Sequence, residues 1–186
     1  MEERALNVVN GMLRKRGYTF ESPELLGNPL DETRMYNLGG ALVIFSEKTR
    51  ISKQELQNYI SFAADNGYTN GTVIVSTILP SDDVMSVVRR YITDTSNPML
   101  QIFDIRHVQF DITTHRKAPP HRVLPEDEKA DIEKRYGSIG VIDCQDAMAK
   151  WIGARPGDIV EIARSSPSAG QSLYWRKCVA DCRRAV

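Results

Sequence analysis

Apolar and polar residues alternate along this chain with two periods, which predict helices and strands in turn. Leu6, Val9 and Leu13 recur at steps of three and four residues. This spacing places them on one face of a helix over residues 2–16. Residues 18–37 show no clear period and contain proline, glycine and acidic side chains, so we expect mostly loop there.

The next part of the chain alternates short β-branched, apolar runs with amphipathic segments. Ser52, with Glu55 three residues later, forms the pattern of a capping box at the start of a helix. Strands that alternate with helices require crossover connections, so we expect an α/β sheet with some parallel pairing. The predicted strands are residues 41–45, 72–76 and 100–105, and the predicted helices are residues 52–66 and 81–91.

The last third of the chain predicts a smaller α+β module. Prolines and histidines in residues 110–124 form a junction that cannot continue a helix. Pro125 and the acidic residues after it favour a helix that reaches Tyr136. A short helix, a turn at Gly153 and two strands joined by a polar loop follow. These two strands include residues 159–162 and 173–175, and the loop is residues 165–170.

This last module also carries a dense series of residues at fixed spacing. The series is Asp146, Ala149, Gly153, Gly157, Asp158, Val160, Ile162, Arg164, Ser166, Ala169 and Gly170. It closely resembles the C-terminal assembly domain of the fifth subunit shared by eukaryotic RNA polymerases I, II and III. The archaeal counterpart in this family consists of this domain alone. Differences such as Ala147 and Gln171 suggest a diverged member, from a unicellular eukaryote or a large DNA virus.

Shorter matches in the rest of the chain resemble the N-terminal jaw domain of the same family. They are Arg16, Gly17, Tyr18, Ile44, Phe45, Pro80 and Ser81, followed in the junction by Ile112, Thr113, His115, Pro119 and His121. The resemblance implies an α/β jaw domain over residues 1–108, three-layered and similar to restriction endonucleases. It implies a small α+β assembly domain over residues 109–186.

The resemblance further implies a non-catalytic subunit of a multi-subunit DNA-directed RNA polymerase. Its partners would be the largest subunit, other polymerase subunits and downstream duplex DNA, whose path it would help to shape. It implies no cofactor, no metal, no small-molecule ligand and no membrane. The expected location is the nucleus, or the virion or viral factory if a virus encodes the chain.

Two groups of residues follow from the resemblance as candidate contacts. Pro80 and Ser81 are expected near downstream DNA, although the neighbouring Asp82 and Asp83 disfavour a close phosphate contact. Tyr174 and Trp175 are consecutive on a strand, so one should pack inward while the other faces a partner. The expected polymerase-docking residues are Trp151, Asp158, Arg164, Ser166, Tyr174, Trp175 and Arg176.

Composition and residue spacing disfavour several other classes of function. The net charge is zero, which disfavours an autonomous nucleic-acid-binding domain. No apolar run has the length of a membrane span, and three cysteines suggest a reducing intracellular compartment rather than a disulfide framework. The spacing of the three histidines matches no common metal-ligand pair.

Two alternatives remain open. A nuclease-like enzyme on the jaw fold would need clustered carboxylates and a lysine around Mg²⁺. After the first predicted strand the chain offers only Glu47 and Lys48, which are adjacent and would point to opposite faces. The other alternative is a stand-alone adaptor that uses the assembly module to recruit proteins to polymerase.

Overall fold

The computed structural model describes residues 1–27, 29–166 and 170–182. The chain divides into two compact units, Met1–Asp111 and Ile112–Val186. A mixed α/β architecture with two sheets is therefore confirmed. The assignment of these units to a jaw and an assembly domain stays a prediction.

The N-terminal unit is built on a five-stranded sheet of order β1-β2-β3-β4-β5. β3, β4 and β5 pair in parallel, as the alternation of strands and helices predicts, whereas β1, β2 and β3 pair antiparallel. The strands are β1 (Glu24–Leu25), β2 (Thr33–Leu38), β3 (Ala41–Ser46), β4 (Thr72–Ser76) and β5 (Leu100–Asp104).

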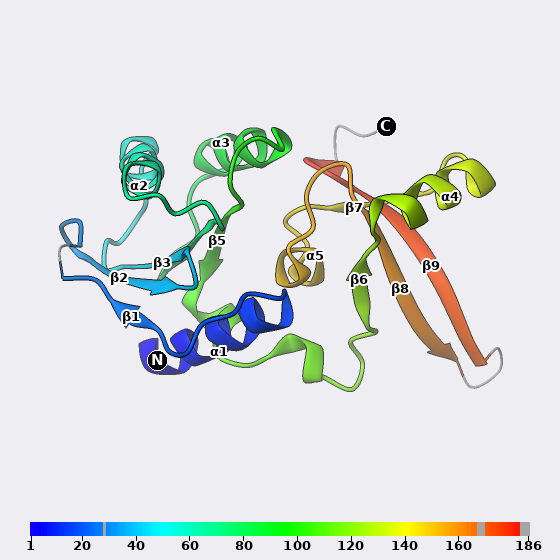
Figure 1. Cartoon of the computed structure of the whole chain (residues 1–186), viewed down its shortest axis with the longest axis horizontal. Helices are drawn as coiled ribbons and strands as arrows, with labels where there is room; N and C mark the ends of the chain where they lie inside the picture. Colours follow the sequence, from blue (N-terminus) through cyan, green and yellow to red (C-terminus); the bar gives the residue numbers. More distant parts are fainter. Residues whose placement is uncertain (28, 167–169, 183–186) are drawn as a thin grey trace. The chain divides into compact units, whose positions relative to one another are not determined.

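Helices lie on both faces of this sheet, so its central strands are buried completely. α2 (Lys53–Asp65) and α3 (Asp82–Thr93) cover one face, and α1 (Glu2–Lys15) lies against the other (Figure 1). Every residue of β3 and β4 is buried, which is the pattern of parallel strands covered on both faces. The predicted capping box of α2 is present, with Ser52 and Glu55 bonded reciprocally.

The expectation of loop up to residue 37 is wrong for β2. Met35 and Leu38 are buried in this strand, while Arg34 points to solvent. Gly39 and Gly40 follow with φ of 63° and 81° and turn the chain into β3. A Cβ on Gly39 would lie 2.8 Å from the Thr19 carbonyl oxygen, so this turn requires glycine.

The C-terminal unit contains a four-stranded sheet of order β6-β8-β9-β7. The sequence predicts β8 and β9 but neither β6 nor β7, because strands of three and four residues are too short to show a period. Two 3₁₀ turns, Ile105–Val108 and Ile112–Thr114, flank the boundary between the units. The strands are β6 (His121–Val123), β7 (Gly140–Asp143), β8 (Ile159–Ser166) and β9 (Gly170–Val179).

Two helices complete the C-terminal unit. α4 (Glu126–Tyr136) buries Ile132 against Leu124 and Ile159. α5 (Ala147–Ile152) begins at Asp146, whose carboxylate accepts from the N–H groups of the two residues at positions 148 and 149. The helix ends at Gly153, which is left-handed with φ of 76°, as predicted.

Candidate functional site: the two faces of the C-terminal hairpin

β8 and β9 form a long antiparallel hairpin whose side chains divide between two faces. The register pairs Glu161 with Trp175 and Ile162 with Tyr174. Residues opposite each other in an antiparallel pair share a face, and neighbours along a strand alternate. Tyr174 and Trp175 therefore point to opposite sides of the sheet, as the sequence predicts.

Trp175 belongs to the face that α4 covers. Its indole N–H donates to a Glu161 carboxylate oxygen at 3.1 Å. Its ring stacks on Tyr136 of α4, with centroids 5.1 Å apart and planes at 26°. The ring also packs against the apolar cluster of Leu124, Ile132 and Ile159. Trp175 thus holds α4 onto the hairpin.

An ion-pair network reinforces this covered face. Arg122 of β6 donates to Glu161 of β8 and to Glu128 of α4, each at 2.7 Å. Hydrogen bonds to these two carboxylates raise the pKa of the Arg122 guanidinium above its ordinary value. Lys177 and Glu133 form a further ion pair at 3.1 Å. The polar groups on this side are largely occupied within the unit.

The opposite side of the hairpin presents a cationic and aromatic surface. The Arg164 guanidinium lies over the Tyr174 ring, 4.9 Å from its centroid. Tyr174 is 46% exposed, and both arginines of this surface, Arg164 and Arg176, are exposed. Arg176 donates to the Val141 carbonyl oxygen at 2.9 Å. We refer to Arg164, Tyr174 and Arg176 as the Tyr174 face.

Trp151 and Asp158, which were also expected to dock, are not free groups on the Tyr174 face. Trp151 of α5 is only 3% exposed. The Asp158 carboxylate accepts from the backbone N–H of Arg155 at 2.6 Å and so closes a turn, while burial raises its pKa. Ser166 ends β8, and its side chain lies outside the described part of the structure. The Tyr174 face therefore brings together three of the seven expected docking residues, Arg164, Tyr174 and Arg176.

The loop after β4 combines exposed aliphatic and acidic groups. Pro80 is buried, and Ser81 is the N-cap of α3 without a capping bond from its side chain. Ile78 and Leu79 are 48% and 41% exposed. Asp83, in the first turn of α3, is highly exposed and lies 3.7 Å from Lys53. The first turn of α3 beside this loop is acidic, and the proximity of Pro80 and Ser81 to DNA stays a prediction.

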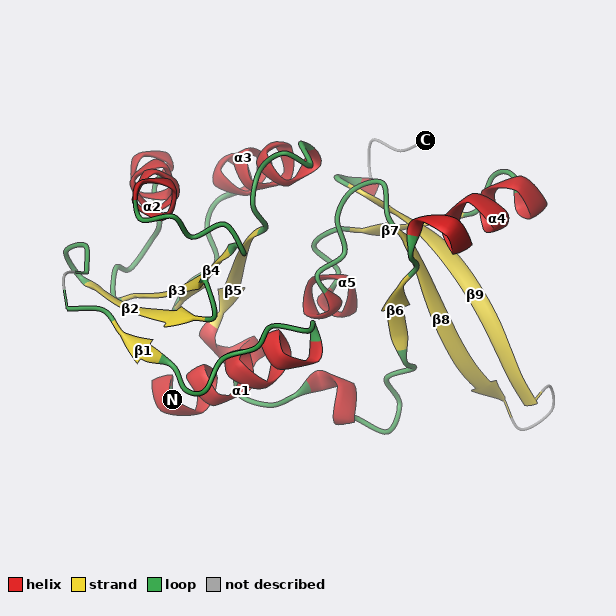
Figure 2. Cartoon of the chain, in the orientation of Figure 1, coloured by secondary structure: helices red, strands yellow, loops and turns green. Residues whose placement is uncertain are grey.

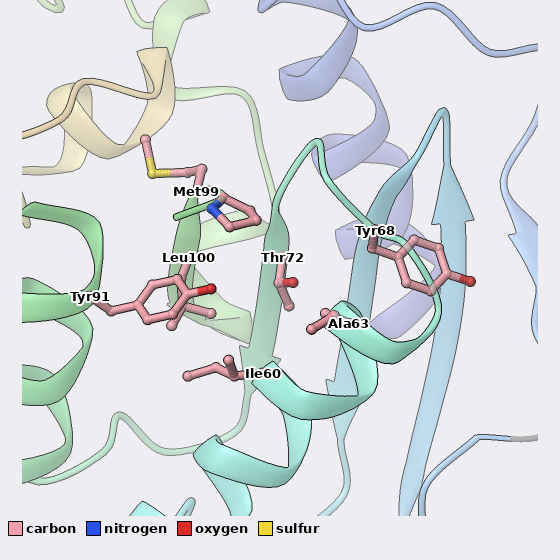
Figure 3. A pocket seen from close by; sticks show the side chains of 9 residues that line it. Ile60, Ala63, Tyr68, Thr72, Tyr91, Met99 and Leu100 are labelled. Carbon is pink, nitrogen blue, oxygen red and sulfur yellow. The ribbon is translucent and has the colours of Figure 1, made fainter. Parts of the chain in front are cut away.

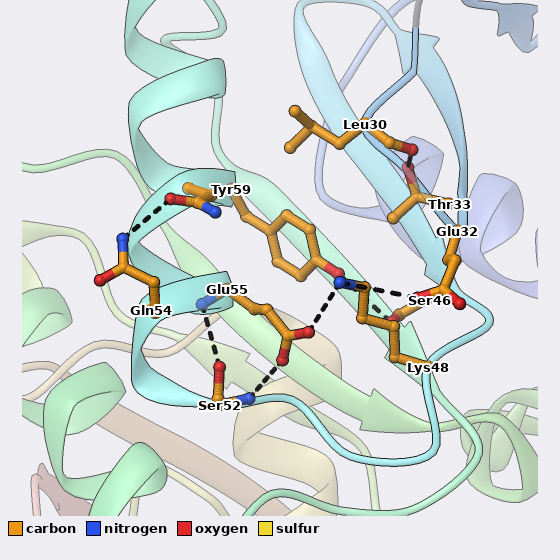
Figure 4. Close-up of polar contacts among 10 residues, drawn as sticks. Leu30, Glu32, Thr33, Ser46, Lys48, Ser52, Gln54, Glu55 and Tyr59 are labelled. Carbon is orange, nitrogen blue, oxygen red and sulfur yellow. Dashed lines mark hydrogen bonds and ion pairs between the residues drawn. The ribbon is translucent and has the colours of Figure 1, made fainter.

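Ion pairs beyond the end of β3 engage Glu47 and Lys48 separately. Lys48 lies 2.8 Å from Glu55 and 3.6 Å from Glu32, so it links α2 to the loop before β2 (Figure 4). Glu47 instead pairs with Arg34 at 3.4 Å. The lysine hydrogen bond holds the pKa of Glu55 below its usual range. These ion pairs stabilise the start of α2. Glu47 and Lys48 have different partners and do not form one site.

The N-terminal unit also contains an apolar hollow beside α2, α3 and β5. Ile60, Tyr91 and Leu100 contribute to its lining, together with the Thr72 hydroxyl (Figure 3). No charged side chain lines it. Among residues 1–27, 29–166 and 170–182, no three histidine, cysteine or acidic side chains are placed to hold a metal ion. No helix in those ranges is both long and apolar enough to cross a membrane.

Comparison with known proteins assigns the sequence of the C-terminal unit to a family. The profile of the RNA polymerase Rpb5 C-terminal domain matches residues 110–178, which include every pair of the β8–β9 register. The DNA-directed RNA polymerase subunit Rpo5 of Thermococcus onnurineus is 40% identical over 77 residues, which are 39% of this chain and 94% of that relative. The chain belongs to the Rpb5 family.

Two further members of the Rpb5 family are similar to this chain, one over a stretch of the same length and one over a longer stretch. The subunit Rpo5 of Archaeoglobus fulgidus is 38% identical over 76 residues, 39% of this chain and 100% of that relative. The subunit rpabc1 of RNA polymerases I, II and III from Dictyostelium discoideum is 22% identical over 144 residues, 74% of this chain and 71% of that relative. The predicted resemblance is confirmed, and the Dictyostelium match is long enough to reach into both units.

Sequence reasoning missed the groups that assemble the covered face of the hairpin. Arg122 and Glu128 are charged residues in a short strand and in an acidic helix, and neither position follows a recognisable motif. Their pairing depends on α4 lying over the hairpin. The one available signal was the acidic first turn of α4, which predicts the helix but not its partner.

Proposed function

We propose that this chain is a non-catalytic subunit of a multi-subunit DNA-directed RNA polymerase, docked on the largest subunit through its C-terminal unit. The observation that carries the proposal is the match with archaeal Rpo5, which covers 94% of that relative. A protein with little beyond the C-terminal unit therefore bears the name of a polymerase subunit. The same unit in this chain carries the Tyr174 face.

The Tyr174 face is the proposed docking surface. Tyrosine and arginine are enriched among the residues that dominate protein interfaces, because they combine apolar area with polar tips. Arg164 already lies over the Tyr174 ring, so both side chains are partly ordered before a partner arrives. The covered face contributes differently, because Trp175 and Arg122 fix the hairpin that presents this surface.

For the N-terminal unit we propose a jaw with a restriction-endonuclease-like fold that shapes the path of downstream DNA. The three layers of helix, sheet and helix support this assignment (Figure 1). The loop with Pro80 and Ser81 would face the duplex at a distance, because Asp82 and Asp83 oppose closer approach. We further propose other polymerase subunits as partners and the nucleus as location, or a virion or viral factory for a virus-encoded chain.

A lack of catalytic activity in the chain itself is part of this proposal. It is supported by the separate ion pairs of Glu47 and Lys48, which leave no shared site for Mg²⁺ between them. Incubation of the purified chain with duplex DNA and Mg²⁺ tests this point. We expect no cleavage. Cleavage that Glu47→Ala abolishes would instead support the nuclease alternative.

Affinity purification of the tagged full-length chain from its native source tests the assembly itself. We expect the largest polymerase subunit in the eluate, together with template-dependent RNA synthesis. Recovery of the chain alone, or with unrelated proteins, would contradict the proposal. Recovery of polymerase with much less than one copy of the chain per enzyme would favour the adaptor alternative.

A further inference from the structure

Part of the outer edge of β9 has no strand beside it in the described part of the chain. β9 pairs with β8 from Gly170 onward, but it pairs with β7 only over residues 176–179. Residues 170–175 therefore have a second edge beside which no described strand lies. Figure 2 shows β8 and β9 continuing well beyond the end of β7.

Hydrogen bonds at the base of the hairpin fix the direction of the peptide groups along β9. The N–H of Cys178 donates to the Asp158 carbonyl oxygen at 2.7 Å. The carbonyl of Cys178 accepts from the N–H of Gly157 at 2.9 Å. Both polar groups of Cys178 thus point toward β8, and the uninterrupted register repeats this direction at every second residue.

The backbone N–H and C=O groups of the intervening residues of β9 point away from β8. The carbonyl of Val179 accepts from the N–H of Cys144, which continues from β7, at 2.9 Å. By the same alternation, the N–H and C=O groups of Gln171 and Leu173 face the uncovered edge, whereas the Trp175 carbonyl lies where the pairing with Gly140 of β7 begins. An additional strand would find donors and acceptors at the correct spacing there.

The sequence of this edge lacks the devices that usually prevent pairing. Residues 170–175 contain no charged residue and no proline. Natural sheets protect exposed edges with short strands, charges, prolines or bulges. The other edge strands follow this rule, since each contains a charged residue: Glu24 in β1, Asp104 in β5, Arg122 in β6 and Asp143 in β7. An uncharged edge of six residues is the exception.

Side chains on the two faces of this edge define the chemistry of a partner. Leu173 is 49% exposed on the side of Trp175, whereas Tyr174 and Arg164 occupy the opposite side. A strand laid beside β9 would place alternate side chains on these two faces. The matching segment carries an aliphatic residue beside Leu173 and, on the opposite face, an acidic residue within reach of the Arg164 guanidinium that lies over Tyr174.

We infer that β9 takes up an extended segment of another polymerase subunit, with alternating aliphatic and acidic residues, as a fifth strand of its sheet. This inference rests on the proposed function and specifies how the docking occurs. Main-chain hydrogen bonds supply the attachment, and the Tyr174 face selects the partner by charge.

Amide hydrogen exchange at single-residue resolution tests the inference, with the free full-length chain compared with the purified polymerase that contains it. The amides of Gln171 and Leu173 should exchange at least about tenfold more slowly in the polymerase, because they gain hydrogen bonds. The amides of Ser172 and Tyr174 bond to β8 in both states and serve as internal controls. Unchanged exchange at both edge positions, in a polymerase that contains the chain, would overturn the inference but not the proposed function.

A pair of substitutions distinguishes the contribution of the Leu173 backbone N–H to docking from that of the Leu173 side chain. Leu173→Pro removes the outward N–H, and Leu173→Ala removes the side chain but keeps this donor. We expect Leu173→Pro to reduce incorporation at least about tenfold more than Leu173→Ala, with circular dichroism confirming that both chains are folded. Equal incorporation of two folded variants would contradict strand addition. Protection of Leu173 in the free chain that rises with its concentration would also contradict it, because the occupant would then be a second copy.

Discussion

Two neighbouring aromatic residues on β9 are expected to have different roles. We expect removal of Trp175 to destabilise the C-terminal unit, and removal of Tyr174 to leave this unit folded but to weaken its assembly into polymerase. Trp175→Ala loses the stack on Tyr136, about 0.5–1.5 kcal/mol, and the hydrogen bond to Glu161, about 0.5–1.5 kcal/mol. With the half-buried ring area included, we expect the C-terminal unit to lose about 3 kcal/mol of unfolding free energy. Tyr174→Ala loses mainly an exposed cation–π contact with Arg164, at most about 1 kcal/mol.

Thermal unfolding of the two variants measures this difference. For a unit of this size, about 1 kcal/mol corresponds to a shift in melting temperature of about 4–8 °C. Trp175→Ala should therefore melt about 15 °C below the wild type, and Tyr174→Ala within about 6 °C of it. Trp175→Phe is the matched control, because it keeps a stacked ring and loses only the indole N–H. Its expected cost is about 1 kcal/mol.

The second half of the prediction concerns assembly. Below the melting temperature of both variants, Tyr174→Ala should incorporate poorly into polymerase although it is folded, because its ring lies on the proposed docking surface. Trp175→Phe should incorporate normally. Equal destabilisation by Tyr174→Ala and Trp175→Ala would refute the division of the hairpin into a covered and a docking face. Normal incorporation of Tyr174→Ala would remove Tyr174 from the interface.

Three further predictions test other parts of the account. Arg164→Glu should reduce incorporation at least about tenfold without changing the melting temperature by more than about 5 °C, and unchanged co-purification would exclude Arg164 from docking. Pro80→Ala with Ser81→Ala should weaken the retention of downstream DNA more than subunit assembly, and unaltered transcription would make this loop dispensable. Because the pKa of Glu55 lies below its ordinary value of 4.5, its contribution to stability is complete above that pH and is lost as pH falls through the folded-state value. Glu55→Gln should therefore flatten the loss of stability below about pH 4.5, and an equally steep loss in the variant would contradict this role.

The sequence predicts the elements whose signals are local. The capping box of Ser52 and Glu55 depends on residues three apart and forms as expected. Gly153 ends α5 in the left-handed conformation that glycine favours. These features need no information from the rest of the chain, so a single sequence is sufficient to find them.

Other features depend on residues distant in the sequence and are not visible in local patterns. β2, with Met35 buried, becomes a strand because it pairs with β3. The alternation of Tyr174 and Trp175 predicts opposite faces, but only the position of α4 decides that Trp175 is the covered one. Trp151 illustrates the same limit, because an aromatic residue at a helix end suits a core as well as an interface.

The copy number of the chain in purified polymerase tests the central claim most directly. The tagged full-length chain would be isolated from its native source, separated by gel filtration in high salt, and quantified against isotope-labelled reference peptides. The account predicts one copy for each copy of the largest subunit, co-eluting with RNA synthesis activity. A chain that elutes away from the largest subunit, or at a small fraction of its amount, would contradict it.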